Sequence, residues 1–389
     1  MHLAFLSGSS YGLLLVFMKL KPIFIFTLVL AVAMLIGLPF VMGDRDVQVS
    51  AKPTESTTVP TEDTTEETTE DTTEAATEMP TEAPTEAPTE PQNPVYTLSF
   101  VGDCTLGCAD LYREDPAGFV MTVGTNYDYP MANVRHIFEA DDFTMANLEG
   151  PLTEGGAQSD KQFVFRGPAA YTAILTGSSI EAVTTANNHV WDYGYGGQKD
   201  TDAALDAAGL AHGSREESFL YTTDSGLTIG VYCDDFAFDK THMTDAIAAL
   251  REQGAEVVVC AFHWGEEKSY TPNGTQTSWG RIAIDVGADI VYGHHAHVLQ
   301  PIEYYNGGVI FYGLGNFSFG GNLNPSDLDT AILQQQFVRQ PDGTLTMGET
   351  IAIPCSISSA ADRNNYQPTL LDEGSEAYNR VLSKLGLTE

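Results

Sequence analysis

Three histidines, His294, His295 and His297, stand at the end of a short apolar run, with a spacing that suits metal binding. The run, residues 290–292, is rich in β-branched side chains and is predicted to form a buried strand. Because Gly293 ends this strand, the imidazoles fall on the loop after it, where side chains two positions apart can converge on one ion. Taken alone, the three residues would also fit a histidine cluster on a surface loop.

The rest of the chain favours the metal site, because other predicted strands also end in polar side chains. A second apolar run, residues 308–312, ends in Gly-Leu-Gly-Asn and places Asn316 after it. Four earlier strands end in the same manner. In chain order, the residues at the strand ends are Asp103, Asn147, Glu149, Asn187, Asn188, His189, Asp192, His263, Glu267, His295, His297 and Asn316. Any one of them could be a turn residue or a structural core histidine, but their recurrence at successive strand ends points to one site.

The types of side chain in this set indicate which ions the site would hold. Carboxylates, imidazoles and amide oxygens together suit borderline or hard divalent ions such as Mn, Fe or Zn. A carboxylate can bridge two such ions about 3.5–4 Å apart, and the ions then activate a water molecule between them. The sequence therefore predicts a divalent-metal site with one or two ions.

Alternating strands and helices must position these residues. Strands are expected at residues 95–101, 180–185, 227–232 and 255–262, with a further strand that begins at residue 143 and closes on Asn147 and Glu149. Helices are expected at residues 131–140, 168–175, 196–208, 243–253 and 277–286. A repeated order of strand, site residue and helix is typical of an α/β fold with its functional loops at one sheet edge.

Beyond Asn316 the pattern changes. Residues 332–338 and 344–353 are joined by a Pro-Asp-Gly turn, which predicts an antiparallel hairpin. Residues 373–385 are expected to form a closing helix.

Charge and cysteine content argue against some classes of protein. In the 389-residue chain, 53 acidic side chains outnumber 18 basic ones, for a formal net charge of −35. This excess argues against a partner such as nucleic acid or an anionic lipid surface, because nothing would offset phosphate repulsion. The five cysteines show no zinc-finger spacing, and a disulfide between Cys104 and Cys108 is left open.

The N-terminal region indicates a location outside the cell. Residues 23–42 carry no charge, and about 20 apolar residues cross the hydrocarbon core of a bilayer. Lys19 and Lys21 precede this run, whereas Arg45 beyond it lies between two aspartates. The positive-inside rule then predicts a cytoplasmic segment at residues 1–22, a transmembrane anchor and an external remainder. A cleaved signal peptide is the alternative, but the run is long and no small-x-small site follows it cleanly.

Residues 43–94 are predicted to be a disordered linker. They consist mainly of repeats of Thr, Glu and Pro, so they have too little apolar surface to offset the entropy of ordering. Charge repulsion and proline should keep the segment extended. Such stalks resemble those of Gram-positive surface proteins, and residues 95–389 are expected to be the globular domain.

Several motifs together carry a family resemblance. They are Gly102-Asp103, Asn147-Leu-Glu149, Asn187-Asn-His189 with Asp192 and Gly194, His263-Trp-Gly-x-Glu267, Gly293-His-His-Ala-His297 and Gly315-Asn316. As an ordered set over about residues 95–320, they resemble the CapA (poly-γ-glutamate capsule synthesis) family. That family is related in fold to the calcineurin-like metallophosphoesterases. The resemblance implies a four-layer α-β-β-α sandwich of the metallo-dependent phosphatase type.

The resemblance also implies roles for individual residues. The metal ligands would be Asp103, Glu149 as the bridging carboxylate, Asn188, His263, His295 and His297. The catalytic residues would be His189 as the acid, Asp192 and Glu267. The substrate-binding residues would be Asn147, Asn187 and Asn316. The sequence departs from the pattern in two places: Cys104 and Thr105 replace an Asp-x-His opening, and Ala296 stands where the family commonly has proline.

Three functions stay open on the sequence alone. The first is a membrane-anchored protein of capsule synthesis or export, with a cell-surface polymer or the export machinery as its partner. The second is a metal-dependent hydrolase of a phosphoester or amide in a cell-surface polymer. The third is a non-catalytic wall-polymer-binding protein. Because only the His-x-His pair matches the family pattern, His294 is expected to contribute little to metal binding.

Overall fold

The structure is a computed structural model, and it describes residues 93–388. The predicted anchor and almost all of the predicted linker lie outside these residues, so both stay predictions. Within the described part of the chain, no helix combines the length and the apolar composition that crossing a membrane requires.

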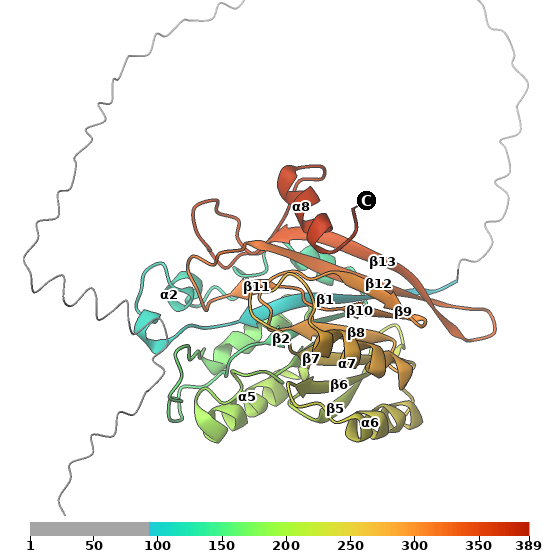
Figure 1. Cartoon of the computed structure of the whole chain (residues 1–389). Helices are drawn as coiled ribbons and strands as arrows, with labels where there is room; N and C mark the ends of the chain where they lie inside the picture. Colours follow the sequence, from blue (N-terminus) through green and yellow to red (C-terminus); the bar gives the residue numbers. More distant parts are fainter. Residues whose placement is uncertain (1–92, 389) are drawn as a thin grey trace, which may run out of the picture. The chain divides into compact units, whose positions relative to one another are not determined.

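Two β-sheets form the centre of the domain (Figure 1). The first has eight strands in the order β14-β13-β12-β1-β2-β3-β4, and β11 pairs with β1 off this path. The pairings among β1, β2, β3, β4 and β11 are parallel, and β12, β13 and β14 extend the sheet by antiparallel pairings. These strands are β1 (Val95–Thr105), β2 (Phe143–Leu148), β3 (Ala182–Thr184), β4 (Ala211–Gly213), β11 (Asn316–Phe319), β12 (Asp329–Arg339), β13 (Leu345–Ser356) and β14 (Thr369–Leu370).

The second sheet has six strands in the order β5-β6-β7-β8-β10-β9. Its four central strands are parallel, and β5 and β9 flank them as antiparallel edges. The strands are β5 (Glu217–Thr222), β6 (Thr228–Asp235), β7 (Val257–His263), β8 (Ile290–His294), β9 (Ile302–Tyr305) and β10 (Gly308–Phe311).

The two sheets pack face to face because both have an apolar inner face. In β7, Val259 lies in the core between the sheets and Phe262 in the core under the outer helices. Such a continuous apolar run is typical of a parallel strand that is buried on both faces. Across the inner core, the rings of Phe100 and Tyr292 lie 5.1 Å apart. The Tyr292 hydroxyl donates to the backbone oxygen of Val101, which ties β8 to β1.

Helices cover the outer face of each sheet. Phe119 of α2, Ile174 of α4 and Leu205 of α5 pack on the first sheet. Met243 of α6 and Ala283 of α7 pack on the second. The helices on these faces are α2 (Phe119–Val123), α3 (Arg135–Phe138), α4 (Thr172–Thr176), α5 (Gly194–Ala208), α6 (Lys240–Glu252) and α7 (Gly274–Asp285), with short 3-10 turns η1 (Asp110–Tyr112) and η2 (Ala169–Tyr171). The layers therefore run helix, sheet, sheet, helix, and the predicted α/β class is confirmed.

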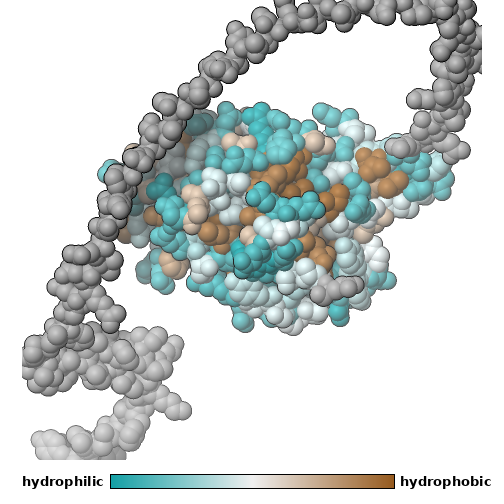
Figure 2. Space-filling view, turned by 90° about the horizontal axis from the view of Figure 1, so that it is seen from above, coloured by the Kyte–Doolittle hydropathy of each residue, from teal (hydrophilic) through white to brown (hydrophobic). Residues whose placement is uncertain are grey.

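The C-terminal helix α8 (Glu376–Lys384) packs against β12 and β13. Val381 enters the core between the sheets. Arg380 and Lys384 each lie 2.7 Å from a carboxylate oxygen of Asp329, at the start of β12. Figure 2 shows the face that carries this helix, where hydrophobic patches lie among mostly hydrophilic residues.

Most predicted elements are present, and the differences have local causes. The predicted hairpin is β12 and β13, in which Arg339 pairs with Leu345 and Gly343 has a φ of 86° in the turn. The helix expected at residues 131–140 is limited to α3. Turns precede α3, and in this segment Asn133 Nδ2 donates to Thr369 Oγ1, a hydroxyl far away in the chain, at 2.8 Å. Strands β4, β5, β9, β11 and β14 were not predicted. Of these, β5 and β9 pair with the next strands in the chain, β6 and β10, whereas β4, β11 and β14 pair with β3, β1 and β13.

Candidate metal centre

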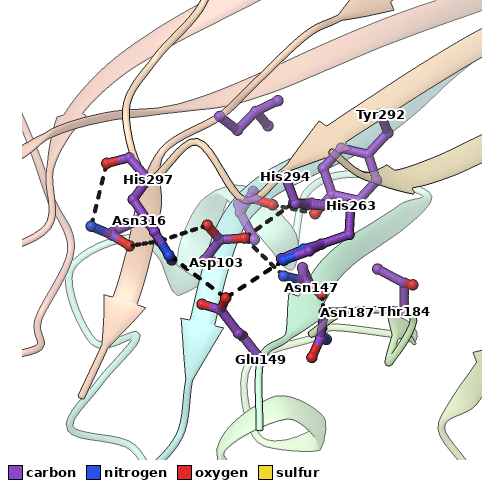
Figure 3. A network of polar contacts seen from close by, with 12 residues as sticks. Asp103, Asn147, Glu149, Thr184, Asn187, His263, Tyr292, His294, His297 and Asn316 are labelled. Carbon is purple, nitrogen blue, oxygen red and sulfur yellow. Dashed lines mark hydrogen bonds and ion pairs between the residues drawn. The ribbon is translucent and has the colours of Figure 1, made fainter. Parts of the chain in front are cut away.

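The carboxyl ends of parallel strands from both sheets meet at one edge, and the candidate site lies there (Figure 3). Asp103 comes from β1 of the first sheet, and His263 comes from β7 of the second. The backbone approaches closely at this point: a Cβ added to Gly102 would lie 2.1 Å from the Gly315 oxygen. Only glycine allows this approach. It lets the Asp103 N–H donate to Gly315 at 2.9 Å and sets Asp103 in register with Asn316.

Buried carboxamides hold Asp103 in place. Asn147 Nδ2 donates to Asp103 Oδ1 at 2.8 Å, and Asn187 Nδ2 donates to Asn147 Oδ1 at 3.0 Å. Asn187 also donates to the Leu148 oxygen at 2.9 Å and accepts from the His189 N–H at 3.1 Å. Both carboxamides were expected to bind substrate. They are instead buried behind the carboxylate, where these hydrogen bonds occupy them.

Asp103 and Glu149 face a shared imidazole. His297 Nδ1 lies 3.1 Å from Asp103 Oδ2, and His297 Nε2 lies 3.7 Å from Glu149 Oε1. Asn316 Oδ1 also contacts His297 Nδ1, at 2.9 Å, and Thr105 Oγ1 donates to Glu149 Oε2 at 3.3 Å. One ligand atom each from Asp103, Glu149 and His297 lies within 4.8 Å of the other two. These three side chains could therefore hold one ion.

His263 approaches Glu149 as well. Its Nε2 lies 3.8 Å from Glu149 Oε1 and 2.8 Å from Asn188 Oδ1. The imidazole is completely buried, and its Nδ1 has no hydrogen-bond partner among residues 93–388. Glu149 thus stands near two imidazoles, as a carboxylate shared between two groups of ligands would.

A second group of possible ligands includes Glu267 and His295. One ligand atom each from Glu267, His295 and His297 lies within 4.8 Å of the others. Glu267 is exposed, whereas His295 is partly buried between the Phe236 ring, at 4.8 Å, and the His263 ring, at 4.7 Å. Glu267, expected as a catalytic residue, is therefore also placed as a possible ligand.

His294 lies in the site, although the sequence did not predict a role for it. It follows Tyr292 by two positions on β8, so its side chain points to the same inner face. His294 Nδ1 lies 3.4 Å from Asp103 Oδ1, and neither ring nitrogen has a hydrogen-bond partner in the described part of the chain. Strand alternation from Tyr292 could have revealed this orientation from the sequence.

The loop that carries the other histidines is held in an unusual backbone conformation. His295 has a φ of 84° and His297 a φ of 55°. Residues other than glycine adopt this left-handed region at a cost of about 1–3 kcal/mol each when the conformation is strained. The loop is held by its surroundings: Ala296 is buried, and its oxygen accepts from the Lys268 N–H at 2.7 Å. Strain of this kind is common where a ligand site is built.

The buried carboxylates and imidazoles shift one another's pKa values. Burial would raise the pKa of Asp103, but contacts with His294 and His297 hold it well below its usual range. Burial raises the pKa of Glu149 to about 7. Burial opposes the charged form of His297, yet Glu149 and Asp103 raise its pKa to about 10. Burial lowers the pKa of His295 to about 4. The site therefore favours positive charge between its two carboxylates.

His189 and Asp192 form a buried pair beside this cluster. His189 Nδ1 lies 2.7 Å from Asp192 Oδ2, which also accepts from the Phe165 N–H at 2.7 Å. The other oxygen of Asp192 lies 2.6 Å from Lys161 Nζ, and Lys161 donates to the Asn188 backbone oxygen at 2.6 Å. Asp192 is fully buried, and its expected catalytic role stays a prediction.

A pocket of about 230 Å³ opens over the cluster. Its lining includes His189, Glu267, His297 and Asn316 from the site, with Phe165 beside them. Asn316 is thus the predicted substrate-binding residue that does line the pocket.

The side chains present fit a divalent cation. Buried atoms without a hydrogen-bond partner among residues 93–388 include Asp103 Oδ2, Glu149 Oε1, His263 Nδ1 and both ring nitrogens of His294. Leaving such an atom unpaired costs about 1–3 kcal/mol. Two carboxylates in one buried site also repel each other. A cation would relieve both costs at once.

Comparison with known proteins identifies the family. The sequence model described as "Bacterial capsule synthesis protein PGA_cap" matches residues 97–233 and 211–321. The chain belongs to this family. The family resemblance predicted from the motifs is thereby confirmed, and the matched span contains the site from Asp103 to Asn316.

Relatives of the chain include two proteins of Bacillus. The "PGA biosynthesis protein CapA" of Bacillus subtilis (strain 168) is 32% identical over 273 residues, which cover 64% of this chain and 70% of the relative. The "Capsule biosynthesis protein CapA" of Bacillus anthracis is 26% identical over 324 residues, which cover 73% and 75%. Among solved structures, the Haemophilus influenzae NAD nucleotidase (NadN) aligns with 76% of this chain and 63% of that chain, at 11% identity and a TM-score of 0.38. A likeness this low carries no argument about function.

Within the span matched by the PGA_cap family, the fold separates the predicted residues into two groups. Those that gather around the cluster and the pocket are Asp103, Glu149, Asn188, His189, His263, Glu267, His295, His297 and Asn316. Those that lie behind it are Asn147, Asn187 and Asp192. Cys104 and Cys108 are free and buried, so the disulfide left open by the sequence is absent.

Proposed function

We propose that this member of the PGA_cap family acts in the synthesis or export of a capsule polymer, poly-γ-glutamate, through a buried divalent-metal site. The observation that supports the metal site best is the arrangement of Asp103 and Glu149. Their carboxylates share one buried cluster with His297, and each has an oxygen without a hydrogen-bond partner among the described residues. The capsule role is supported by family membership and by the printed names of the Bacillus relatives.

The ligands would come from both sheets. They are Asp103, Glu149, Asn188, His263, His295 and His297, and their mixture suits Mn, Fe or Zn, as one or two ions. A bound ion of this kind supplies Lewis acidity and lowers the pKa of a bound water molecule. The metallophosphoesterase-like site would then act on a phosphoester or an amide of a cell-surface polymer.

His189 would handle the proton of such a reaction. Its Nδ1 is held by Asp192 at 2.7 Å, so its Nε2 is the nitrogen left for a molecule in the pocket. From there it can give a proton to a leaving oxygen or nitrogen. Asp192 keeps the ring in this orientation.

The proposed location is the outer face of a cell membrane, with residues 23–42 as the anchor and residues 43–94 as a spacer to the domain. The support is the uncharged apolar run and the lysines before it. Protease added to intact protoplasts should remove the domain while a cytoplasmic marker protein survives. Full protection of the domain would overturn this topology, and mature protein free in the medium would favour a cleaved signal peptide.

The metal content of the purified full chain tests the central proposal. We expect bound Mn, Fe or Zn in the parent and little in Asp103→Asn, which keeps an acceptor for Asn147 but loses the charge. An activity screen with bis-p-nitrophenyl phosphate and γ-glutamyl amides then separates the candidate functions. Metal-dependent hydrolysis would support the hydrolase. Bound metal without hydrolysis of any substrate would favour a non-catalytic role in polymer binding or export.

A further inference from the structure

A larger cavity continues the pocket over the metal cluster. It has a volume of about 700 Å³ and is lined by residues 108–112, 115, 118, 158, 162–165, 320–324 and Tyr366. We refer to it as the adjoining groove. The lining residues that it shares with the pocket are Phe163, Phe165, Gly321, Asn322 and Asn324. A molecule whose end lies in the pocket can therefore extend into the groove.

Large apolar side chains are exposed along the adjoining groove. Leu111 is 82% exposed, Tyr112 52% and Phe163 57%. Phe163 lies at the junction, because it lines both cavities. Aromatic side chains that are left in solvent at a concave surface offer flat faces for a ligand to cover.

Carboxamides supply the polar part of the same walls. Gln158, Gln162 and Asn324 are exposed and line the groove. Each carboxamide offers both a hydrogen-bond donor and an acceptor, so it suits a ligand whose hydroxyl or amide groups need both.

The groove offers no cation to a ligand. Among residues 93–388, no lysine or arginine belongs to its lining. The nearby Arg166 is paired with Asp110 at 2.7 Å, and Arg113 with Glu154 at 3.0 Å. Asp115 adds negative charge to the wall. An anionic chain would therefore gain no electrostatic attraction here and would be repelled.

The backbone of the walls also disfavours an extended peptide. Peptides commonly bind by adding a strand to an exposed sheet edge. The described walls of the groove are mainly loops between β1 and α2, between β2 and α4 and after β11. They offer no such edge for a ladder of backbone hydrogen bonds.

We infer that the adjoining groove binds a neutral saccharide chain. A sugar ring has an apolar face of C–H groups that can lie on the ring of Phe163 or Tyr112, and its hydroxyls can pair with the carboxamides. One end of the chain would reach the pocket beside His189. This inference depends on the proposed function only for the reaction at that end of the saccharide. Binding of the saccharide in the groove needs no metal.

Titration calorimetry of the full chain with chitohexaose, an uncharged hexasaccharide, tests the inference. We expect saturable binding that persists in EDTA, and an affinity about tenfold lower in Phe163→Ala. The matched control is Tyr304→Ala, which removes an aromatic ring that is 61% exposed on β9, outside both cavities. It should bind as the parent does. Thermal unfolding of both variants confirms that each is folded.

Other outcomes would overturn the inference. Absence of chitohexaose binding at millimolar concentration would do so, as would equal affinity in the parent and Phe163→Ala. A γ-glutamate hexamer that binds more tightly than chitohexaose and loses affinity in Phe163→Ala would show that the groove takes an anionic peptide chain. Because the titration is done in EDTA, a failure of the metal proposal would leave these results unchanged.

Discussion

His294 Nδ1 lies 3.4 Å from Asp103 Oδ1, across the gap between the two sheets. The imidazole is buried, and no described residue hydrogen-bonds to either of its nitrogens. The sequence pattern predicted that this histidine contributes little to metal binding. At the proposed metal site, the contact with Asp103 would place His294 either on the ion or directly behind the carboxylate ligand.

We therefore expect His294→Ala to weaken metal binding by about 10- to 100-fold, the usual effect of losing a ligand or its direct support. Titration with Co²⁺, followed by its visible absorption, measures both the affinity and the change in ligand field. The control is His136→Ala, since His136 is exposed on α3. If His294→Ala and the parent bound Co²⁺ equally, His294 would have no part in the site.

Metal should stabilise the fold. A divalent ion at a hundredfold excess over its dissociation constant should raise the free energy of unfolding by about 2.7 kcal/mol, because it binds only the folded chain. Denaturant unfolding with and without Mn²⁺ measures this gain. Asp103→Asn should abolish it, whereas Asp224→Asn, in an exposed turn, should retain it. A full gain in Asp103→Asn would place the ion elsewhere.

The proposed proton donor gives a kinetic prediction. In the metal-loaded chain, His189→Ala should lower kcat for bis-p-nitrophenyl phosphate by about 10²–10⁴-fold, the usual contribution of a general acid. Asp192→Asn should also lower kcat, because Asp192 holds the His189 ring in place through Nδ1 at 2.7 Å. His212→Ala, which removes a histidine paired with Asp206 away from the site, is the control. Unchanged kcat in His189→Ala would remove this residue from the mechanism.

Glu181 gives a prediction for stability against pH. Burial raises its pKa from 4.5 to about 7, while its carboxylate accepts from the Thr144 N–H at 2.7 Å. The folded state thus binds this proton more tightly than the unfolded chain, so the free energy of unfolding falls as pH rises from about 4.5 to about 7. Glu181→Gln keeps an acceptor and removes the charge.

We expect Glu181→Gln to be about 1–2 kcal/mol more stable than the parent at pH 8, after allowance for solvent screening, and equally stable near pH 4. Urea unfolding across this pH range measures the difference. The control is Glu252→Gln at the exposed end of α6, which should show no such dependence. A parent whose stability rose from pH 5 to pH 8 relative to Glu181→Gln would contradict the raised pKa.

The strands that carry the site could be read from local pattern. A continuous apolar run such as β7, followed by a polar residue, shows both where a strand lies and where it ends. The sheet edge that carries the site was also predictable, because parallel strands have their carboxyl ends at the same edge of a sheet. Strands β4, β11 and β14 and the limits of α3 were not predictable, because contacts with segments elsewhere in the chain create them.

The sequence by itself determined the α/β class, the family and most of the side chains that could bind metal, since all three follow from local pattern and ordered motifs. Only the tertiary structure decided what each side chain does. The tertiary structure buries Asn147, Asn187 and Asp192 behind the cluster. It also places His294, from the opposite sheet, in contact with Asp103. The physical reason is that a hydrogen bond or a ligand contact depends on packing across the two sheets, and residues more than a hundred positions apart in the chain meet only when that core has formed.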